Sequence, residues 1–354
     1  MEIGSILLAF GYGDSDPKKI GSGHINETFL LEDKNGKKSV LQKINTKVFE
    51  KPELLMSNLV LVLDHLSNSD YPYNLMEIIP TMSGGQYIQD SKGLWRMLSY
   101  MKGKEASVRP ANLKKAEVVA EGYGNFLKAI NTLDPKRLHD TIKGFHGPEK
   151  RFQQFVDSTE IAAEDKLEVS SSLIDHALAF SQLTLQYSKC CDILPPRITH
   201  GDTKASNILV DKSGEKVSAV IDLDTVMSGF IMNDFGDMVR SMCNTGAEDD
   251  NKLEAIQLDL ENFKGISTGF LRAFSSEITQ EELDSLLIGV KSILYEQFLR
   301  FLTDFLQGDV YYTVDYPDQN LNRAKVHLKL LLDFQKREEL FIDILNECLG
   351  QLDE

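Results

Sequence analysis

The sequence predicts an α+β protein with two lobes, a small N-terminal lobe built on a β-sheet and a larger, mostly helical C-terminal lobe. Strand-like segments with turn signals dominate residues 20–100, whereas apolar residues recur at three- and four-residue spacing over most of the chain after Ala111. One strand-like island, residues 207–223, interrupts the helical part. We place the boundary near Gly103, which gives lobes of residues 1–102 and 103–354.

The N-terminal lobe is expected to contain a β-hairpin. Its two strands, residues 29–31 and 39–44, flank Lys34-Asn35-Gly36-Lys37, and Asn-Gly is a strong signal for a tight hairpin turn. The other elements predicted for this lobe are a helix over Lys51–Asn68 and strands over Ile78–Gln89 and Leu94–Met101.

The C-terminal lobe shows the apolar spacing of amphipathic helices in six segments. These are Ala116–Asn131, Pro148–Asp157, Asp165–Lys189, Leu253–Phe274, Gln280–Gln307 and Asn320–Cys348. The island between them predicts a second hairpin, with strands over Asn207–Val210 and Val217–Leu223 around a polar turn.

Composition restricts the classes of partner. The 354-residue chain carries 54 acidic against 38 basic residues, a net charge of −16, and has no run of five Lys or Arg. Such a surface repels nucleic acid and anionic lipid, so neither is an expected partner. The four cysteines lack metal-ligand spacing, and no apolar run approaches the roughly 20 residues of a membrane helix. We therefore expect a cytoplasmic monomer with reduced thiols.

The strongest chemical signal lies at the entrance to the second hairpin. His200, Asp202, Lys204 and Asn207 form the pattern H-x-D-x-K-x-x-N, the protein-kinase type of catalytic loop. In that chemistry an Asp orients the acceptor hydroxyl and accepts its proton, while cations take up the charge on the transferred phosphoryl group. Asp202 and Lys204 are therefore the predicted catalytic residues.

The hairpin also predicts a metal site. A turn centred near Ser213 and Gly214 pairs positions whose numbers sum to about 428, which places Asn207 beside Asp222 at the open end. An amide oxygen and a carboxylate suit Mg²⁺, which prefers oxygen ligands and completes its shell with water or phosphate. Asp234-Phe235-Gly236 spells the metal-binding D-F-G of protein kinases but lies beyond the hairpin, so we interpret Asp234 as a buried structural acceptor.

These residues resemble the aminoglycoside phosphotransferase/choline kinase superfamily of small-molecule kinases, which have a protein-kinase-like bilobal fold. The likeness is closest to bacterial N-acetylhexosamine 1-kinases and extends from about residue 20 to 330. The segments that carry it are Gly21–Asn26, Leu41-Gln42 with Asn45-Thr46, Thr199–Leu209, Ile221–Thr225, Asp234–Asp237 and Phe301–Asp309. The resemblance implies ATP-dependent phosphorylation of the anomeric hydroxyl of N-acetylglucosamine or N-acetylgalactosamine, with ATP and Mg²⁺ as cofactors.

Nucleotide-binding residues follow from the same comparison. Gly21, Ser22 and Gly23 lie where a kinase keeps its phosphate-covering loop, although the segment alone is an ordinary turn signal. Because side chains alternate along a strand, only one of Gln42 and Lys43 faces the phosphates, and the resemblance favours Gln42. No Glu partner on the following helix is evident, though Glu53 is possible. The adenine is expected at the segment linking the lobes, Met97–Met101, with Tyr100 and Met101 as contacts.

Three residues are candidates for sugar binding. Asp224 is two residues after Asp222 and shares its strand face if the strand stays extended. Arg300 is a charge within an apolar helical stretch, and His24 adjoins the Gly-rich segment. Each has an alternative interpretation. Asp224 could be a capping or surface carboxylate, and Arg300 could form an i,i+4 ion pair with Asp304. His24 could be an ordinary polar loop residue.

Rival functions remain open. One is a kinase of the same fold that phosphorylates choline, another amino alcohol or an aminoglycoside; choline would need an aromatic cage, for which no cluster is obvious. The other is a non-catalytic kinase-like binding protein, supported only by the missing strand lysine.

Overall fold

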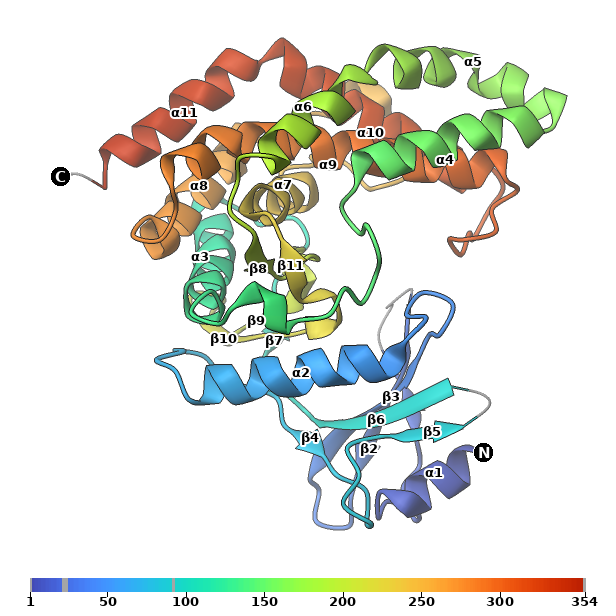
Figure 1. Cartoon of the computed structure of the whole chain (residues 1–354), viewed down its shortest axis with the longest axis vertical. Helices are drawn as coiled ribbons and strands as arrows, with labels where there is room; N and C mark the ends of the chain where they lie inside the picture. The colour runs from blue at the N-terminus through green and yellow to red at the C-terminus, as the bar shows by residue number, and fades with distance from the viewer. Residues whose placement is uncertain (1, 21–24, 91–92, 353–354) are drawn as a thin grey trace.

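The computed structural model describes residues 2–20, 25–90 and 93–352 and shows the expected α+β, kinase-like architecture of two lobes (Figure 1). The N-terminal lobe is an antiparallel sheet with strand order β1-β2-β3-β6-β4, and β5 also pairs with β6. Its elements are α1 (Ile3–Ala9), β1 (Lys18–Lys19), β2 (Glu27–Glu32), β3 (Lys38–Ile44), α2 (Pro52–Ser67), β4 (Ile78–Ile79), β5 (Ile88–Asp90) and β6 (Gly93–Ser99).

The first hairpin is confirmed as β2 and β3. Its turn depends on Gly36, whose φ of 77° is in the left-handed region, and on Asp33, whose carboxylate accepts from the backbone of Asn35 and Lys37 at 2.8 Å. The predicted strand over Ile78–Gln89 was wrong. A loop splits it into β4 and β5, because Pro80 has no N–H for the ladder and Gly84 takes a φ of 87°.

The sheet has two different faces because side chains alternate along its strands. On one face, Leu41, Trp95 and Met97 pack against α1 through Ile6, Leu7 and Phe10. On the other, Ile44, Leu94 and Leu98 join the main core, together with α2 and the C-terminal helices. The short helix α1, which the sequence did not predict, therefore seals the face that points away from the large lobe.

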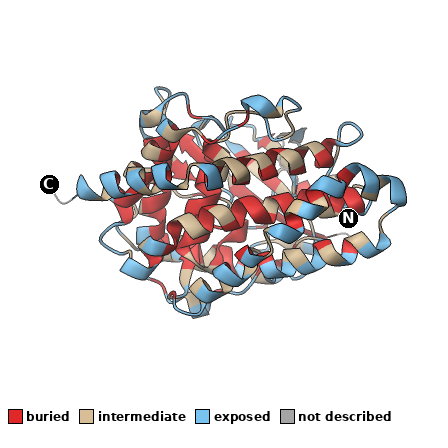
Figure 2. Cartoon of the chain, turned by 90° about the horizontal axis from the view of Figure 1, so that it is seen from above, coloured by how far each residue is buried: buried red, intermediate tan, exposed pale blue. Residues whose placement is uncertain are grey.

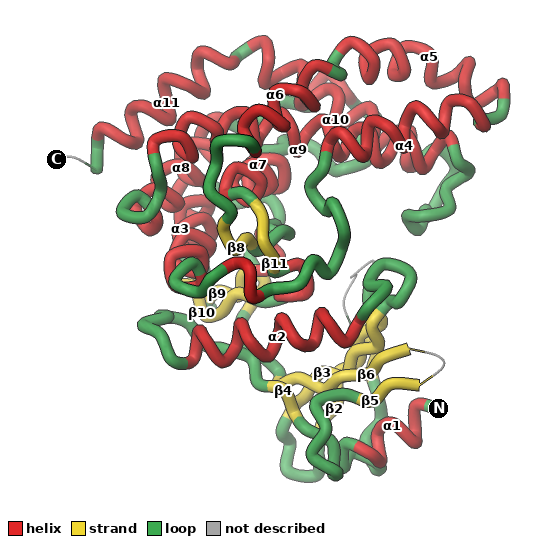
Figure 3. The backbone as a smooth tube through the Cα atoms, in the orientation of Figure 1, coloured by secondary structure: helices red, strands yellow, loops and turns green. Residues whose placement is uncertain are grey.

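The C-terminal lobe is helical apart from five short strands (Figure 3). Its elements are β7 (Lys104–Glu105), α3 (Leu113–Ile130), α4 (Pro148–Ile161), α5 (Glu164–Ala179), α6 (Gln182–Cys191), β8 (Arg197–Thr199), β9 (Ile208–Val210), β10 (Val217–Val220), β11 (Met227–Gly229), α7 (Ile231–Met242), α8 (Leu260–Phe274), α9 (Gln280–Leu306), α10 (Gln319–Lys336) and α11 (Glu338–Gly350).

All six predicted helical segments contain a helix, but three of them are interrupted where the sequence predicted a continuous helix. The segment 165–189 is two helices that meet at Phe180-Ser181, and 320–348 is two helices that meet at Arg337. Residues 253–255 form a separate 3-10 turn before α8. Helix α7 was missed, although its buried apolar residues follow the three- and four-residue spacing of a helix.

The second hairpin has the expected register. Ile208 pairs with Val220 and Leu209 with Ala219, and the N–H of Ile221 donates to the carbonyl of Asn207 at 2.9 Å. Strand β7, which follows the interlobe segment, pairs with β9, while β8 and β11 form a separate pair.

Helix α7 packs tightly against α9, whose residues are mostly buried (Figure 2). A methyl group on Gly289 would lie closer to the carbonyl of Met232 than the 3.0 Å that real Cβ atoms keep, and one on Gly236 would lie 2.5 Å from the carbonyl of Gly289. The two backbones are therefore in direct contact. Within the described ranges, no helix is both long and apolar enough to cross a bilayer.

Candidate active site

Asp234 on α7 fixes the loop that leaves β8. Its carboxylate accepts from the backbone N–H of His200 at 2.7 Å and of Gly201 at 2.8 Å, and the side chain is fully buried. Burial raises the pKa of Asp234 to about 7, although both hydrogen bonds act to lower it. Gly201 has a φ of 79°, and a Cβ there would lie 2.8 Å from the carbonyl of Thr225. The prediction that Asp234 is a buried structural acceptor is confirmed.

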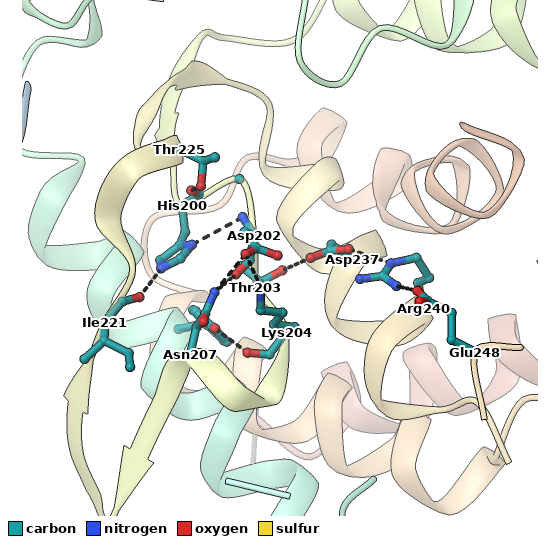
Figure 4. Close-up of polar contacts among 12 residues, drawn as sticks. His200, Asp202, Thr203, Lys204, Asn207, Ile221, Thr225, Asp237, Arg240 and Glu248 are labelled. Carbon is teal, nitrogen blue, oxygen red and sulfur yellow. Dashed lines mark hydrogen bonds and ion pairs between the residues drawn. The ribbon is translucent and has the colours of Figure 1, made fainter. Parts of the chain in front are cut away.

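His200 joins this loop to the end of β10 (Figure 4). Its Nε2 lies 3.1 Å from the carbonyl oxygen of Ile221, and its Nδ1 accepts from the N–H of Asp202 at 3.3 Å. Burial lowers the pKa of His200, so the ring is neutral, with Nε2 as the donor. His200 thus holds the backbone of Asp202 beside the residue that precedes Asp222.

The carboxylate of Asp202 is held by the two side chains that the sequence pattern predicts. Its Oδ2 accepts from Nζ of Lys204 at 2.6 Å and from Nδ2 of Asn207 at 3.0 Å (Figure 4). Burial acts to raise the pKa of Asp202, but the ammonium of Lys204 outweighs it and holds the pKa below its usual range. Asp202 is therefore an oriented, ionised carboxylate at neutral pH.

Asn207 and Asp222 lie at the open end of the hairpin, as expected. Asp222 has a φ of 60° and a ψ of 60°, a left-handed conformation that Asp tolerates better than most residues. Burial, together with the nearby negative charges of Asp224 and Asp202, raises the pKa of Asp222 to about 7. A divalent cation would relieve this crowding of carboxylates.

The donor set at this point fits Mg²⁺, since it consists of a carboxylate and an amide oxygen. Among the described residues, no group of three or more His, Cys, Asp or Glu side chains could hold a metal ion. A cation held by Asn207 and Asp222 would therefore take most of its ligands from water and phosphate oxygens.

Gln42 lies on the face of β3 that is turned toward the C-terminal lobe, and Lys43 lies on the opposite face. Lys43 lies 3.4 Å from Glu27 and 5.7 Å from the ring centroid of Trp95, on the α1 face of the sheet. The Oε1 of Gln42 accepts from Arg96 on the neighbouring strand. Glu53 is exposed on the first turn of α2, so it is no partner for a cation in the cleft.

The remaining nucleotide candidates are only partly described. Tyr100 lies between β6 and β7, with Nζ of Lys38 5.8 Å from its ring centroid, and Met101 packs on the main core. Gly21, Ser22, Gly23 and His24 lie outside the described residues.

Asp224 is buried and bridges the two lobes. Its Oδ1 accepts from Nη2 of Arg96 at 2.6 Å, and its Oδ2 accepts from Nδ2 of Asn26 at 2.8 Å; both donors belong to the N-terminal lobe. Asp224 is 4% exposed, so its alternative interpretation as a surface carboxylate was wrong.

Arg300 lies over two tyrosine rings instead of pairing with Asp304. Its Cζ is 5.9 Å from the ring centroid of Tyr311 and 5.5 Å from that of Tyr312. Asp304 accepts from the backbone N–H groups of Tyr311 and Tyr312, so the alternative i,i+4 pair was wrong.

A chain of buried contacts connects the region of Arg300 to the catalytic loop. The negative charge of Glu296 helps to raise the pKa of Arg300. Nδ1 of His146 lies 3.6 Å from Glu296, and Nε2 of the same ring lies 2.9 Å from the carbonyl oxygen of Gly201.

Comparison with known proteins agrees with this geometry. A family model described as the phosphotransferase enzyme family, APH, matches residues 16–265. This span is more than half of the chain and includes the catalytic loop, the hairpin and Asp234. The chain belongs to the APH phosphotransferase family.

Solved structures of such enzymes share the fold. A microcompartment-associated aminopropanol kinase has a TM-score of 0.66 at 16% identity, over 96% of this chain and 98% of that chain. An ethanolamine kinase from Plasmodium vivax has a TM-score of 0.60 at 15% identity, over 94% and 90%. An amicoumacin kinase in complex with AMP-PNP and Ca²⁺ has a TM-score of 0.59 at 13% identity, over 88% of each chain.

Two features of this APH phosphotransferase were missed from the sequence. Arg96 is the buried cation between Gln42 and Asp224, and its signal was a charge inside the apolar run of β6. Arg240 donates to Asp237 at 2.7 Å and lies 3.8 Å from Glu248 (Figure 4). Its positive charge contributes to the low pKa of Asp202, so it lies on the same side of the site.

The arrangement suits the phosphoryl transfer of the family. An ionised carboxylate at Asp202, with the positive charge of Lys204 beside it and oxygen ligands at the hairpin end, is the set of groups that this chemistry requires. The intact set argues against a non-catalytic binding protein.

Proposed function

We propose that this phosphotransferase moves the γ-phosphoryl group of ATP to the anomeric hydroxyl of an N-acetylhexosamine, giving the sugar 1-phosphate. The bond that forms joins the anomeric oxygen to Pγ, and the bond that breaks joins Pγ to the β–γ bridging oxygen. Asp202 positions the hydroxyl and accepts its proton, and Lys204 meets the charge on the γ-phosphate. Asn207 and Asp222 would hold Mg²⁺, which supplies charge neutralisation on the phosphates.

The same proposal assigns the binding residues. Gly21, Ser22 and Gly23 cover the phosphates, and Tyr100 and Met101 contact the adenine. Gln42 faces the nucleotide, while His24, Asp224 and Arg300 bind the sugar. Hydrogen bonds from such Asp, Arg and His side chains suit a neutral polyhydroxyl ligand.

One observation carries the choice of a neutral acceptor over a cationic one. Three aromatic rings of the C-terminal lobe already contact arginines, since Arg300 lies over Tyr311 and Tyr312, and Cζ of Arg323 lies 5.5 Å from the ring centroid of Phe301. An aromatic cage for choline needs free ring faces. The Oη of Tyr312 is buried without a hydrogen-bond partner among the described residues, as expected where a hydroxyl group of a ligand binds.

The test is a panel of acceptors with ATP and Mg²⁺, followed by phosphorus NMR of the product. The panel contains N-acetylglucosamine, N-acetylgalactosamine, choline, ethanolamine and an aminoglycoside. We expect turnover of the two sugars, a sugar 1-phosphate as product, and no turnover after EDTA treatment. The matched control is the 1-O-methyl glycoside of each sugar, which lacks the anomeric hydroxyl and should be inert. Phosphorylation of the glycoside, or preferential turnover of an amine, would refute the proposal.

Arg300 provides a second check on the acceptor. We expect Arg300→Met to raise the KM for the sugar about tenfold to a hundredfold, because a hydrogen bond from a charged donor contributes about 1.5–3 kcal/mol. The KM for ATP should stay within about twofold. Arg137→Met, at an exposed position, is the control. An unchanged KM for every acceptor that is turned over would remove Arg300 from the binding site.

A further inference from the structure

Arg96 is a buried guanidinium on the cleft side of the N-terminal sheet. It is 2% exposed, and its Nε and Nη2 donate to Oε1 of Gln42 at 3.0 and 2.8 Å. Nη2 also donates to Oδ1 of Asp224 at 2.6 Å. Nη1 is buried and has no hydrogen-bond partner among residues 2–20, 25–90 and 93–352. A buried charged donor without a partner is costly, and such groups cluster at ligand sites.

Arg96 lies beside the strand position where protein kinases have a lysine and this chain has Gln42. Gln42 and Arg96 are register partners on β3 and β6, so their side chains share one face of the sheet. Lys43, the cation at the end of β3, is on the opposite face with Trp95 and Glu27. On the face that Gln42 shares, Arg96 is therefore the buried positive charge of these two strands, since Lys38 at the far end of β3 is exposed.

Arg96 also points toward the expected metal site. Its partner Asp224 lies within the short 3-10 turn Leu223–Thr225, and Asp222 is the residue that directly precedes this turn. Phosphates held through a cation on Asp222 would approach the same space.

We propose that Arg96 binds a phosphate oxygen of the nucleotide through Nη1 and takes the part that a strand lysine has in protein kinases. Asp224 and Gln42 are positioning residues, because they hold the Nε and Nη2 edge and leave Nη1 free to reach the anion. A planar guanidinium fixed on one edge is well suited to this task. The proposal rests on the proposed ATP site but not on the identity of the acceptor.

Titration calorimetry without acceptor tests this, comparing MgADP with adenosine, which lacks phosphates. We expect Arg96→Met to lower the affinity for MgADP about tenfold to a hundredfold, because a charge-assisted hydrogen bond is lost. The affinity for adenosine should stay within about twofold of the wild-type value. Lys43→Met is the control, because Lys43 is a cation of the same sheet on the opposite face. It should change the affinity for neither MgADP nor adenosine. The double variant Arg96→Met with Gln42→Lys restores an ammonium on the cleft face and should regain MgADP affinity.

Other outcomes overturn the proposal. If Arg96→Met weakens MgADP and adenosine equally, or weakens neither, Arg96 only bridges the lobes. If Arg96→Met does not fold, Gln42→Glu decides: its carboxylate neutralises the guanidinium in place and should weaken MgADP selectively, whereas an unchanged MgADP-to-adenosine ratio refutes phosphate binding. Wild-type protein that binds MgADP but phosphorylates no sugar would refute the 1-kinase function alone, while failure to bind MgADP would refute the nucleotide site and this inference together.

Discussion

Asp202→Asn is expected to lower kcat by about 10³-fold, because the amide cannot accept the proton of the acceptor hydroxyl. Asn has the same shape as Asp and keeps one oxygen for the contacts with Lys204 and Asn207, which lie 2.6 and 3.0 Å from Oδ2 in the wild type. Nucleotide binding should therefore persist. The measurement is steady-state kinetics with calorimetry for MgADP.

Asp211→Asn is the matched control for this change, since Asp211 belongs to the exposed turn of the same hairpin. It should retain wild-type kcat. If Asp202→Asn keeps more than about one tenth of the wild-type kcat, the loss of rate is smaller than removal of a catalytic base causes. Asp202 is then not the proton acceptor.

Gly289→Ala is expected to destabilise the protein by about 3 kcal/mol or more, at the upper end for overpacking, because the new methyl group meets backbone. The group in its way is the carbonyl of Met232 on α7, and a backbone carbonyl cannot rotate aside as a side chain can. Separation of α7 from α9 also shifts Asp234, which holds the catalytic loop. Urea denaturation and kcat, measured on the same preparation, should both fall.

Gly4→Ala is the control for the loss of a helical glycine. Nothing lies within 4 Å of a Cβ at Gly4 in α1, so this change should be neutral or raise stability by up to about 1 kcal/mol. Equal stability of the Gly289→Ala and wild-type proteins would show that α7 and α9 can separate without cost, contrary to their close packing.

The catalytic residues could be predicted because they are local in sequence. His200, Asp202, Lys204 and Asn207 lie in one loop, and the turn of the following hairpin fixes the register that brings Asp222 to Asn207. Asp234 could be interpreted as a structural acceptor because it lies beyond the hairpin, too far along the chain to share a metal ion with Asn207. In each case a short stretch of backbone determines the geometry.

The remainder of the site depends on contacts between distant segments. Arg96 meets Asp224 only because β6 pairs with β3 and the lobes close on one another, and no periodicity in the sequence reports that contact. The strand predicted over 78–89 fails for a different reason, since Pro80 and the turn at Gly84 interrupt the pairing that Ile78, Ile79 and Ile88 make with β6. Helix α7 was missed although its signal is in the sequence, since Ile231, Phe235, Met238 and Met242 recur at three- and four-residue spacing.

The bridge at Asp224 has a thermodynamic consequence. One carboxylate contacts Arg96 and Asn26 across the cleft, and under the proposed function the sugar shares it. Binding at either site then changes the free energy of the other, and linkage requires the effect to be reciprocal. If bound nucleotide changes the affinity for the sugar by some factor, then bound sugar must change the affinity for the nucleotide by the same factor.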